Sequence, residues 1–266
     1  MAENAARARR FRSAAPHYLS GRQPYAGRLI RRVADLVGLG PDARVLDLGC
    51  GPGMLAGAFA PHARAVVAMD PEPAMLRIAE QTFTAPNIAY RQGSSEDLPG
   101  DLGHFRLVTM GRSFHWMDRA ETLRRLDRML VPGGAVALFD ARGAQEPFDT
   151  WPERYAELVR SYRGRDRERP RTRSPEWRQH ELLLLDSAFA SVDLLSVFEP
   201  HEVTAAILID RALSRSSSAP GRLGGAADQL ARDIESLVAA ASPDGRLREV
   251  VVSTALIGRR PGEVDT

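Results

Sequence analysis

The sequence of 266 residues contains no lysine and a single cysteine. All 36 basic residues are arginine, which excludes Schiff-base catalysis and a phosphate-binding loop of the usual kind, because both need a lysine amine. Because Cys50 is alone, no disulfide can form within the chain. No run of about 18 apolar residues predicts a membrane span, and the basic N-terminus lacks the apolar segment of a signal peptide. We therefore expect a cytoplasmic protein with no membrane partner. The bias toward Arg, Ala, Gly and Pro is typical of a GC-rich genome and indicates a bacterial protein.

The charge balance argues against a nucleic-acid partner. The 36 basic residues face 34 acidic ones, which leaves a formal net charge of only +2. The arginine-rich run at 163–178 lies in a segment that also contains Trp151, Tyr155, Tyr162 and Trp177, and arginine beside aromatic residues can bind nucleic acid. The run also contains Asp166, Glu168 and Glu176, so we interpret it as a solvated or mobile segment. With 44% hydrophobic residues, the chain has enough apolar side chains for a large core.

The segment VLDLGCGPG, from Val45 to Gly53, predicts a binding site at the end of a strand. An apolar run leads to three alternate glycines, and the short helical stretch MLAGAFAPHA follows. Glycines let the backbone approach a ligand closely, and a helix N-terminus offers free N–H groups. A second apolar strand, RAVVAMD, ends at Asp70, where nucleotide-binding α/β folds place a carboxylate that accepts ribose hydroxyls. Two alternatives stay open: in one, the glycines form a tight turn that binds no ligand; in the other, Asp70 only caps the helix that follows it.

The spacing differs from the dinucleotide fingerprint G-x-G-x-x-G, and Asp47 stands where it would repel a pyrophosphate. VLDLGCGPG instead resembles motif I of the class I S-adenosyl-L-methionine (SAM) dependent methyltransferases. VVAMDPEPAML, QGSSEDLP, FRLVTMGRSFHWMD and LRRLDRMLVPGGAVALFD resemble the later motifs in the same order, so the resemblance covers roughly residues 40–140. PHYLSGRQPYAGRLIRRVADL is similar to the N-terminal helices of the UbiE-like, or type 11, subgroup, and the region around LSRSSSAPGRLGG resembles actinobacterial members.

This resemblance implies SAM as the cofactor, with its methionine part held by the glycine turn. It implies that Ser94, Ser95 and Glu96 bracket the adenine, although many relatives have Asp in place of Ser94. On the N-terminal segment, Tyr18 and Arg22 would close over SAM, with Arg22 pairing with its carboxylate. The full set of implied cofactor-binding residues is Tyr18, Arg22, Asp47, Gly49, Cys50, Gly51, Gly53, Asp70, Pro71, Met75, Ser94, Ser95, Glu96, Gly111 and Arg112.

The alternation of strands and helices predicts an α/β fold with helices on both faces of a parallel sheet. The resemblance implies a Rossmann-like, mostly parallel sheet of seven strands. We expect an N-terminal helical lid at 1–41, a SAM-binding core at 42–140, an inserted substrate cap at 141–190 and the rest of the core sheet with helices at 191–266. Leu29, Ile30, Val33, Leu36 and Val37 have the spacing of an amphipathic helix within the lid.

For catalysis, the loop GRSFHWMD after the fourth predicted strand offers His115 as a general base, because its ordinary pKa lies near neutrality. The alternative is a structural histidine. The other histidines are scattered without metal-ligand spacing, so we expect no metal. We predict methyl transfer to an O or N atom of a small molecule in secondary metabolism. The alternatives are a SAM-fold protein with a non-methylating reaction such as a cyclisation, an NAD(P)-dependent oxidoreductase and an RNA methyltransferase; the oligomeric state stays open.

Overall fold

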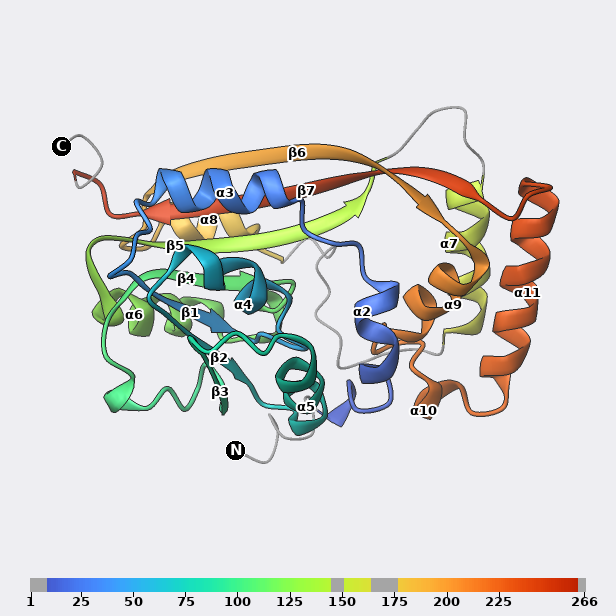
Figure 1. The fold of residues 1–266 in the computed structure, drawn as a ribbon, viewed down its shortest axis with the longest axis horizontal. Helices are drawn as coiled ribbons and strands as arrows, with labels where there is room; N and C mark the ends of the chain where they lie inside the picture. Colours follow the sequence, from blue (N-terminus) through green and yellow to red (C-terminus); the bar gives the residue numbers. More distant parts are fainter. Residues whose placement is uncertain (1–8, 145–150, 164–176, 263–266) are drawn as a thin grey trace. The chain divides into compact units, whose positions relative to one another are not determined.

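The computed structural model describes residues 9–144, 151–163 and 177–262, and its central element is a seven-stranded sheet (Figure 1). The strand order is β3-β2-β1-β4-β5-β7-β6. All four pairs from β3 to β5 are parallel, and the arrow of β7 points opposite to those of β5 and β6 in Figure 1. This confirms the predicted mostly parallel sheet. The strands are β1 Arg44–Leu48, β2 Ala65–Asp70, β3 Ile88–Gln92, β4 Phe105–Gly111, β5 Leu130–Gly143, β6 Ser191–Val203 and β7 Leu247–Arg259.

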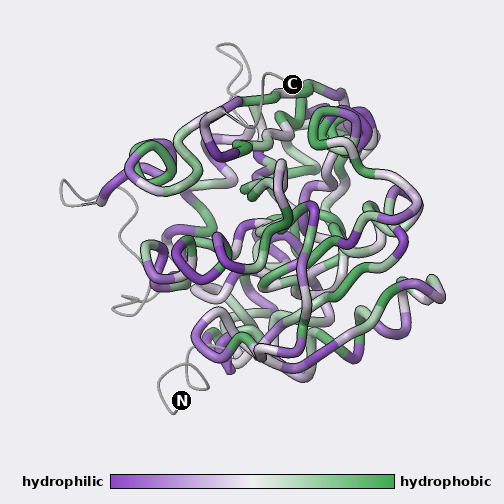
Figure 2. The backbone as a smooth tube through the Cα atoms, turned by 90° about the vertical axis from the view of Figure 1, so that its left-hand side faces the viewer, coloured by the Kyte–Doolittle hydropathy of each residue, from purple (hydrophilic) through white to green (hydrophobic). Residues whose placement is uncertain are grey.

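Helices connect the strands of the described chain, and Figure 2 shows purple and green alternating within single helical turns, as expected for amphipathic helices. None of the described helices is both long and apolar enough to cross a membrane. The helices are α2 Tyr18–Gly21, α3 Gly27–Leu36, α4 Met54–Phe59, α5 Pro73–Thr82, α6 Arg119–Met129, α7 Trp151–Tyr162, α8 His180–Leu185, α9 Ala205–Leu213, α10 Pro220–Leu223 and α11 Ala226–Ala241; short 3-10 turns are η1 Ala15–His17, η2 Ala60–His62, η3 Gly100–Leu102 and η4 Phe114–Trp116.

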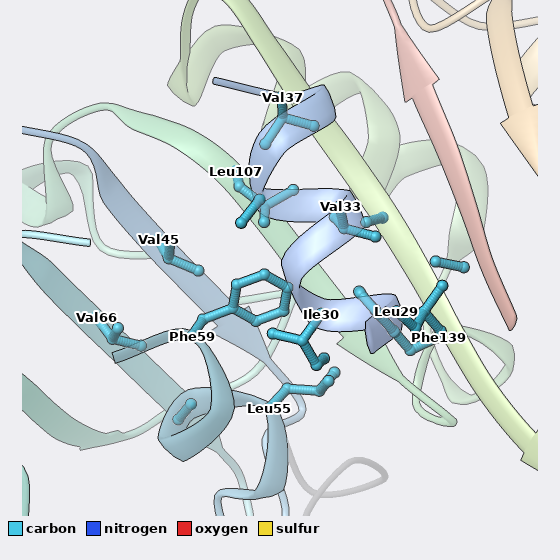
Figure 3. Close-up of a cluster of buried hydrophobic side chains, with 14 of the residues drawn as sticks. Leu29, Ile30, Val33, Val37, Val45, Leu55, Phe59, Val66, Leu107 and Phe139 are labelled. Carbon is cyan, nitrogen blue, oxygen red and sulfur yellow. The ribbon is translucent and has the colours of Figure 1, made fainter. Parts of the chain in front are cut away.

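The two faces of the sheet have separate apolar cores. Neighbouring residues of one strand belong to different cores, as Val45 and Leu46 do, because successive side chains point to opposite faces. On one face, Ile30 of α3 and Phe59 of α4 pack against the strands (Figure 3). On the other face, Leu126 of α6 and residues of α8 do the same. The sheet is therefore covered by helices on both faces, as predicted.

The chain divides into two compact units, and three of the boundaries between them fall within β5, β6 and β7. The sheet unit comprises the described residues of 25–141, 170–197 and 253–266. The helical unit comprises those of 1–24, 142–169 and 198–252, and its core joins α7, α9 and α11 through Tyr155, Leu208 and Ile234. This grouping differs from the four segments expected from the sequence.

Within the expected lid, α3 belongs to the sheet unit, and its buried side chains are part of the core of that unit. Leu36 departs from the predicted apolar stripe, because 38% of its surface is exposed. The expected cap contains α7 and α8, whereas most of the basic run at 163–178 lies outside the described residues. The functions of lid and cap stay predictions.

Candidate active site

The glycine turn after β1 has a backbone that only glycine adopts readily. Gly49, Gly51 and Gly53 have φ angles of 70°, 54° and 84°, all in the left-handed region. A Cβ at Gly49 would lie 2.6 Å from the Cβ of Ser113, whereas a Cβ at Gly51 would meet no atom within 4 Å. The turn is thus closely packed at its first glycine and open at its second. This opening is where a ligand can reach the backbone.

The end of β2 holds this turn in place. The N–H groups of Gly49 and Cys50 both donate to the carbonyl of Met69, at 2.8 and 2.9 Å. Burial raises the pKa of the Cys50 thiol well above its usual range, and the charges of Asp70 and Asp47 act in the same direction. Cys50 is therefore a buried, protonated thiol and not a thiolate nucleophile.

Asp47, on β1, is a buried carboxylate with two donors. Its Oδ2 accepts from the N–H of Ala56 at 3.0 Å, and its Oδ1 accepts from the Thr109 hydroxyl at 3.0 Å. Burial raises the pKa of Asp47 to about 7; the two hydrogen bonds oppose this shift, and the charge of Asp70 adds to it. The carboxyl group is thus poised between its two protonation states near neutral pH, and a cationic ligand would favour the charged one.

Asp70 joins the glycine turn to the start of α5. Its Oδ2 accepts from the N–H of Gly51 and its Oδ1 from the N–H of Glu72, both at 2.9 Å. The alternative that Asp70 caps α5 is wrong, because the side chain of Glu72 accepts from the N–H of Ala74 as the N-cap. Burial raises the pKa of Asp70 to about 6, and the two backbone bonds oppose this. Each carboxylate oxygen can still accept a further hydrogen bond, such as one from a hydroxyl group.

The loop after β4 lies against the glycine turn. The hydroxyl of Ser113 donates to the carbonyl of Leu48 at 2.9 Å. Arg112 has a φ of 55°, a conformation that costs strain in a residue with a side chain and often marks a functional site. Its guanidinium lies 4.8 Å from the ring centre of Tyr25, and one of its amino groups lies 3.7 Å from the sulfur of Met54 at the start of α4.

His115 lies on the short turn η4 that follows this loop. Its side chain is partly exposed, and its ring centre lies 5.3 Å from that of Trp116. Phe114, its neighbour in the chain, is buried, and its ring centre is 5.1 Å from that of His180. The position of His115 at the carboxyl edge of the sheet agrees with the expected place of a base; its role as a base stays a prediction.

The segment expected to bracket adenine follows β3. The N–H of Gly93 donates to the carbonyl of Asp70 at 3.2 Å, so the segment begins beside the acidic end of β2. The hydroxyl of Ser94 accepts from the N–H of Glu96 at 3.3 Å, and Ser95 is buried. Farther along the chain, Arg125 donates to the carbonyls of Ser95 and Glu96. The sequence did not single out this arginine, because it lies on a helix far along the chain.

The structure brings most of the expected cofactor residues into one unit. All of them from Asp47 to Arg112 belong to the sheet unit, as does His115. Met75 is buried, so its side chain packs within the protein. Tyr18 and Arg22 belong to the helical unit, where the Arg22 guanidinium lies 4.8 Å from the ring centre of Tyr18 and donates to the carbonyl of Ser214 at 3.1 Å.

Comparison with known protein families gives a match over part of the chain. A sequence profile described as a methyltransferase domain matches residues 45–134, which contain the glycine turn, β2, β3, β4 and the loop after β4. Residues 45–134 therefore match a methyltransferase domain, in agreement with the resemblance of the sequence motifs to the class I SAM-dependent methyltransferases. The subgroup suggested by the N-terminal segment stays a prediction.

Two relatives show how far the likeness extends along the chain. An uncharacterized methyltransferase of Schizosaccharomyces pombe is 28% identical over 158 residues, which is 59% of this chain and 61% of that protein, less than two thirds of its length. An uncharacterized methyltransferase of Mycobacterium tuberculosis is 29% identical over 206 residues, or 77% of this chain and 76% of the relative.

Solved structures show the same fold. A putative type II methyltransferase from Anaeromyxobacter dehalogenans has a TM-score of 0.62 and 21% identity, covering 89% of this chain and 96% of the other. The cyclase SpnF has a TM-score of 0.50 and 18% identity, covering 91% and 85%. At these identities the likeness concerns the Rossmann-like fold alone.

Proposed function

We propose that this methyltransferase binds SAM at the glycine turn and transfers a methyl group to an O or N atom of a small molecule, in secondary metabolism. The observation that carries the proposal is the position of Asp70. This carboxylate holds the N–H of Gly51, at the open point of the turn, and keeps acceptor capacity for the two hydroxyls of a ribose.

The residues around the turn fit the two ends of this cofactor. The carboxyl group of Asp47 would favour the positive charges of the methionine part, and would repel the pyrophosphate of a dinucleotide. Ser94, Ser95 and Glu96 would bracket the adenine without the aspartate found in many relatives. The exposed face of Gly51 supplies the space that the cofactor needs, since a Cβ there would project into it.

When bound, SAM supplies a methyl group already activated by its sulfonium, so the task of the protein is to position the acceptor. An amine acceptor needs only to be deprotonated and correctly placed. A hydroxyl acceptor benefits from a base, and His115 at the carboxyl edge of the sheet is the candidate in this chain. We propose a small molecule rather than a nucleic acid as the acceptor, because the net charge of +2 gives no broad basic surface.

Calorimetric titration with S-adenosylhomocysteine, SAM and NAD tests the proposal. We expect the first two to bind and NAD not to bind. Asp70→Ala should bind SAM and S-adenosylhomocysteine more weakly, by about 1.5–3 kcal/mol for each charged hydrogen bond removed. Asp101→Ala is the matched control, because the side chain of Asp101 is 77% exposed and lies outside the turn.

Tight NAD binding without a response to S-adenosylhomocysteine would contradict the proposal. If Asp70→Ala bound S-adenosylhomocysteine like the wild type, Asp70 would serve only to hold the turn. Assays with a panel of small phenols and amines then separate methyl transfer from a non-methylating reaction, because only methyl transfer converts SAM to S-adenosylhomocysteine. Binding to RNA with a steep salt dependence would replace the small-molecule acceptor with a nucleic acid.

A further inference from the structure

The helical unit concentrates arginines around the C-terminal end of α9. Arg211 lies in the last turn of α9, and Arg215 follows two residues after the helix ends. Arg163 follows α7, and Arg22 follows α2 and donates to the carbonyl of Ser214. Arg163, Arg22 and Arg211 all act on the pKa of Arg215, so each of these three guanidinium groups lies within electrostatic reach of Arg215.

One of these arginines is fully engaged. Arg211 makes a two-pronged ion pair with Glu249, with distances of 2.8 and 2.6 Å, and its Nε donates to the carbonyl of Gly21 at 3.2 Å. Both side chains of this pair are less than a tenth exposed. The carboxylate of Glu249 is therefore already used, because its two oxygens both face Arg211.

Arg215 is in a different situation. Its Nε–H is buried without a hydrogen-bond partner among the described residues. Burial lowers the pKa of Arg215 to about 10; the neighbouring arginines act in the same direction, and Tyr155 opposes them. Asp210 of α9 does not help, because it accepts from His17 at 2.7 Å and from Ser20 at 2.5 Å. Within the described chain, the site is a partly buried cation surrounded by cations.

The serine run beside Arg215 contains a second unsatisfied group. Ser214 and Ser218 donate to the carbonyls of Arg211 and Ala212, at 2.9 and 2.7 Å, which completes the end of α9. Ser217 is only 4% exposed, yet its hydroxyl has no partner among the described residues. Buried polar groups are nearly always hydrogen-bonded, so two orphan donors two residues apart in the sequence require an explanation.

We propose that the helical unit binds an anionic group of a small molecule, a carboxylate or a phosphate, at Arg215 and Ser217. The planar guanidinium of Arg215 matches the two oxygens of such a group, and the Ser217 hydroxyl donates to it. Arg22 adds positive charge. The identity of the anion rests on the proposed function: for a methyltransferase, the small molecule bound here is the methyl acceptor. The substrate class is then small molecules that carry an acidic group.

Inorganic phosphate is the probe for this site in the full chain. We expect phosphate, compared with sodium chloride of equal ionic strength, to raise the melting temperature of the wild type and of Arg248→Met, an exposed control in the same unit. Arg215→Met should lose this rise, with a dissociation constant for phosphate at least tenfold higher in calorimetry. Without phosphate, this variant should melt at the same temperature as the wild type or higher, because an unpaired buried cation opposes folding.

Ser217→Ala provides an independent variant, because removal of an unpartnered hydroxyl leaves folding intact. It should weaken phosphate binding several-fold. Equal phosphate responses in the wild type, Arg215→Met and Ser217→Ala would overturn the proposal.

S-adenosylhomocysteine separates this site from the cofactor. We expect Arg215→Met to bind it like the wild type. If that variant lost S-adenosylhomocysteine and phosphate to the same extent, and phosphate competed with S-adenosylhomocysteine, the anion would be the carboxylate of the cofactor and the proposal would be wrong. If no protein bound S-adenosylhomocysteine while phosphate behaved as expected, the methyltransferase function would fail and the anion site would stand.

Discussion

Replacing Asp47 by asparagine removes a buried charge and leaves its hydrogen bonds in place. The amide oxygen of the variant can accept from the N–H of Ala56, as Oδ2 does at 3.0 Å. The amide NH₂ can donate to the hydroxyl oxygen of Thr109, which is 3.0 Å from Oδ1. The hydroxyl of Thr109 then donates to the carbonyl of Leu46, 3.5 Å away. The substitution therefore tests the charge alone.

The pKa of Asp47 fixes the sign and size of the effect. Burial raises it from 3.8 to about 7, so the native state binds more protons than the unfolded state between these values. Stability therefore falls as the pH rises through this window, and the full loss is reached above pH ~7. At 1.36 kcal/mol for each pH unit, the loss amounts to about 4 kcal/mol. Asp70, with its pKa raised to about 6, acts with the same sign at lower pH.

Asp47→Asn escapes this loss, so its advantage over the wild type should grow with pH. We expect a difference in unfolding free energy of about 1 kcal/mol at pH 4.5 and about 4 kcal/mol at pH 8. Urea unfolding at both pH values measures it, with Asp101→Asn as the exposed control. A variant less stable than the wild type at pH 8, or a difference independent of pH, would refute this reasoning.

The same carboxylate should matter in the opposite direction for the cofactor. A cation at the glycine turn favours the charged form of Asp47, so SAM binding should release protons and tighten as the pH rises toward 8. Asp47→Asn should bind SAM more weakly than the wild type at pH 8 and lose this pH dependence. Functional sites commonly contain a residue that destabilises the fold but strengthens the binding of the ligand.

Two further substitutions test the turn and the base. Gly51→Ala should cost about 1–2 kcal/mol of stability, because an alanine is strained at a left-handed φ, and should lower the affinity for S-adenosylhomocysteine at least tenfold. Gly224→Ala is the control: Gly224 has a φ of 55°, and a Cβ there would also meet no atom within 4 Å, so this variant should lose stability but keep its affinity for S-adenosylhomocysteine. His115→Ala should lower turnover of a hydroxyl acceptor by ~10²–10⁴ and remove its decline at acidic pH, with cofactor affinity unchanged; a loss of less than tenfold with an unaltered pH profile would indicate catalysis by positioning.

Local patterns predicted the sheet unit well because its elements are defined by neighbouring residues. Apolar runs ending at glycine or an acid gave β1 and β2, and the alternate glycines gave the turn. The partners of the acids were harder to predict. Thr109 contacts Asp47 across 62 positions of the chain, through the pairing of β1 with β4. The sequence did mark Thr109, because this threonine interrupts the apolar strand FRLVTMG. A lone polar residue in a strand does not, however, identify the residue that it contacts.

The helical unit shows a stricter limit of prediction from sequence. The net charge is a sum over the whole chain, and it does not show where charges of one sign gather in the fold. A net charge of +2 argues against a large basic surface for nucleic acid. The same total hides a local excess around Arg215, whose neighbours come from segments far apart in the sequence. Burial changes what such an excess can bind: an extended polyanion needs accessible cations along its length, whereas one carboxylate or phosphate can reach a partly buried guanidinium. The near-neutral total and the anion site at Arg215 are therefore compatible, and together they favour a small acidic ligand.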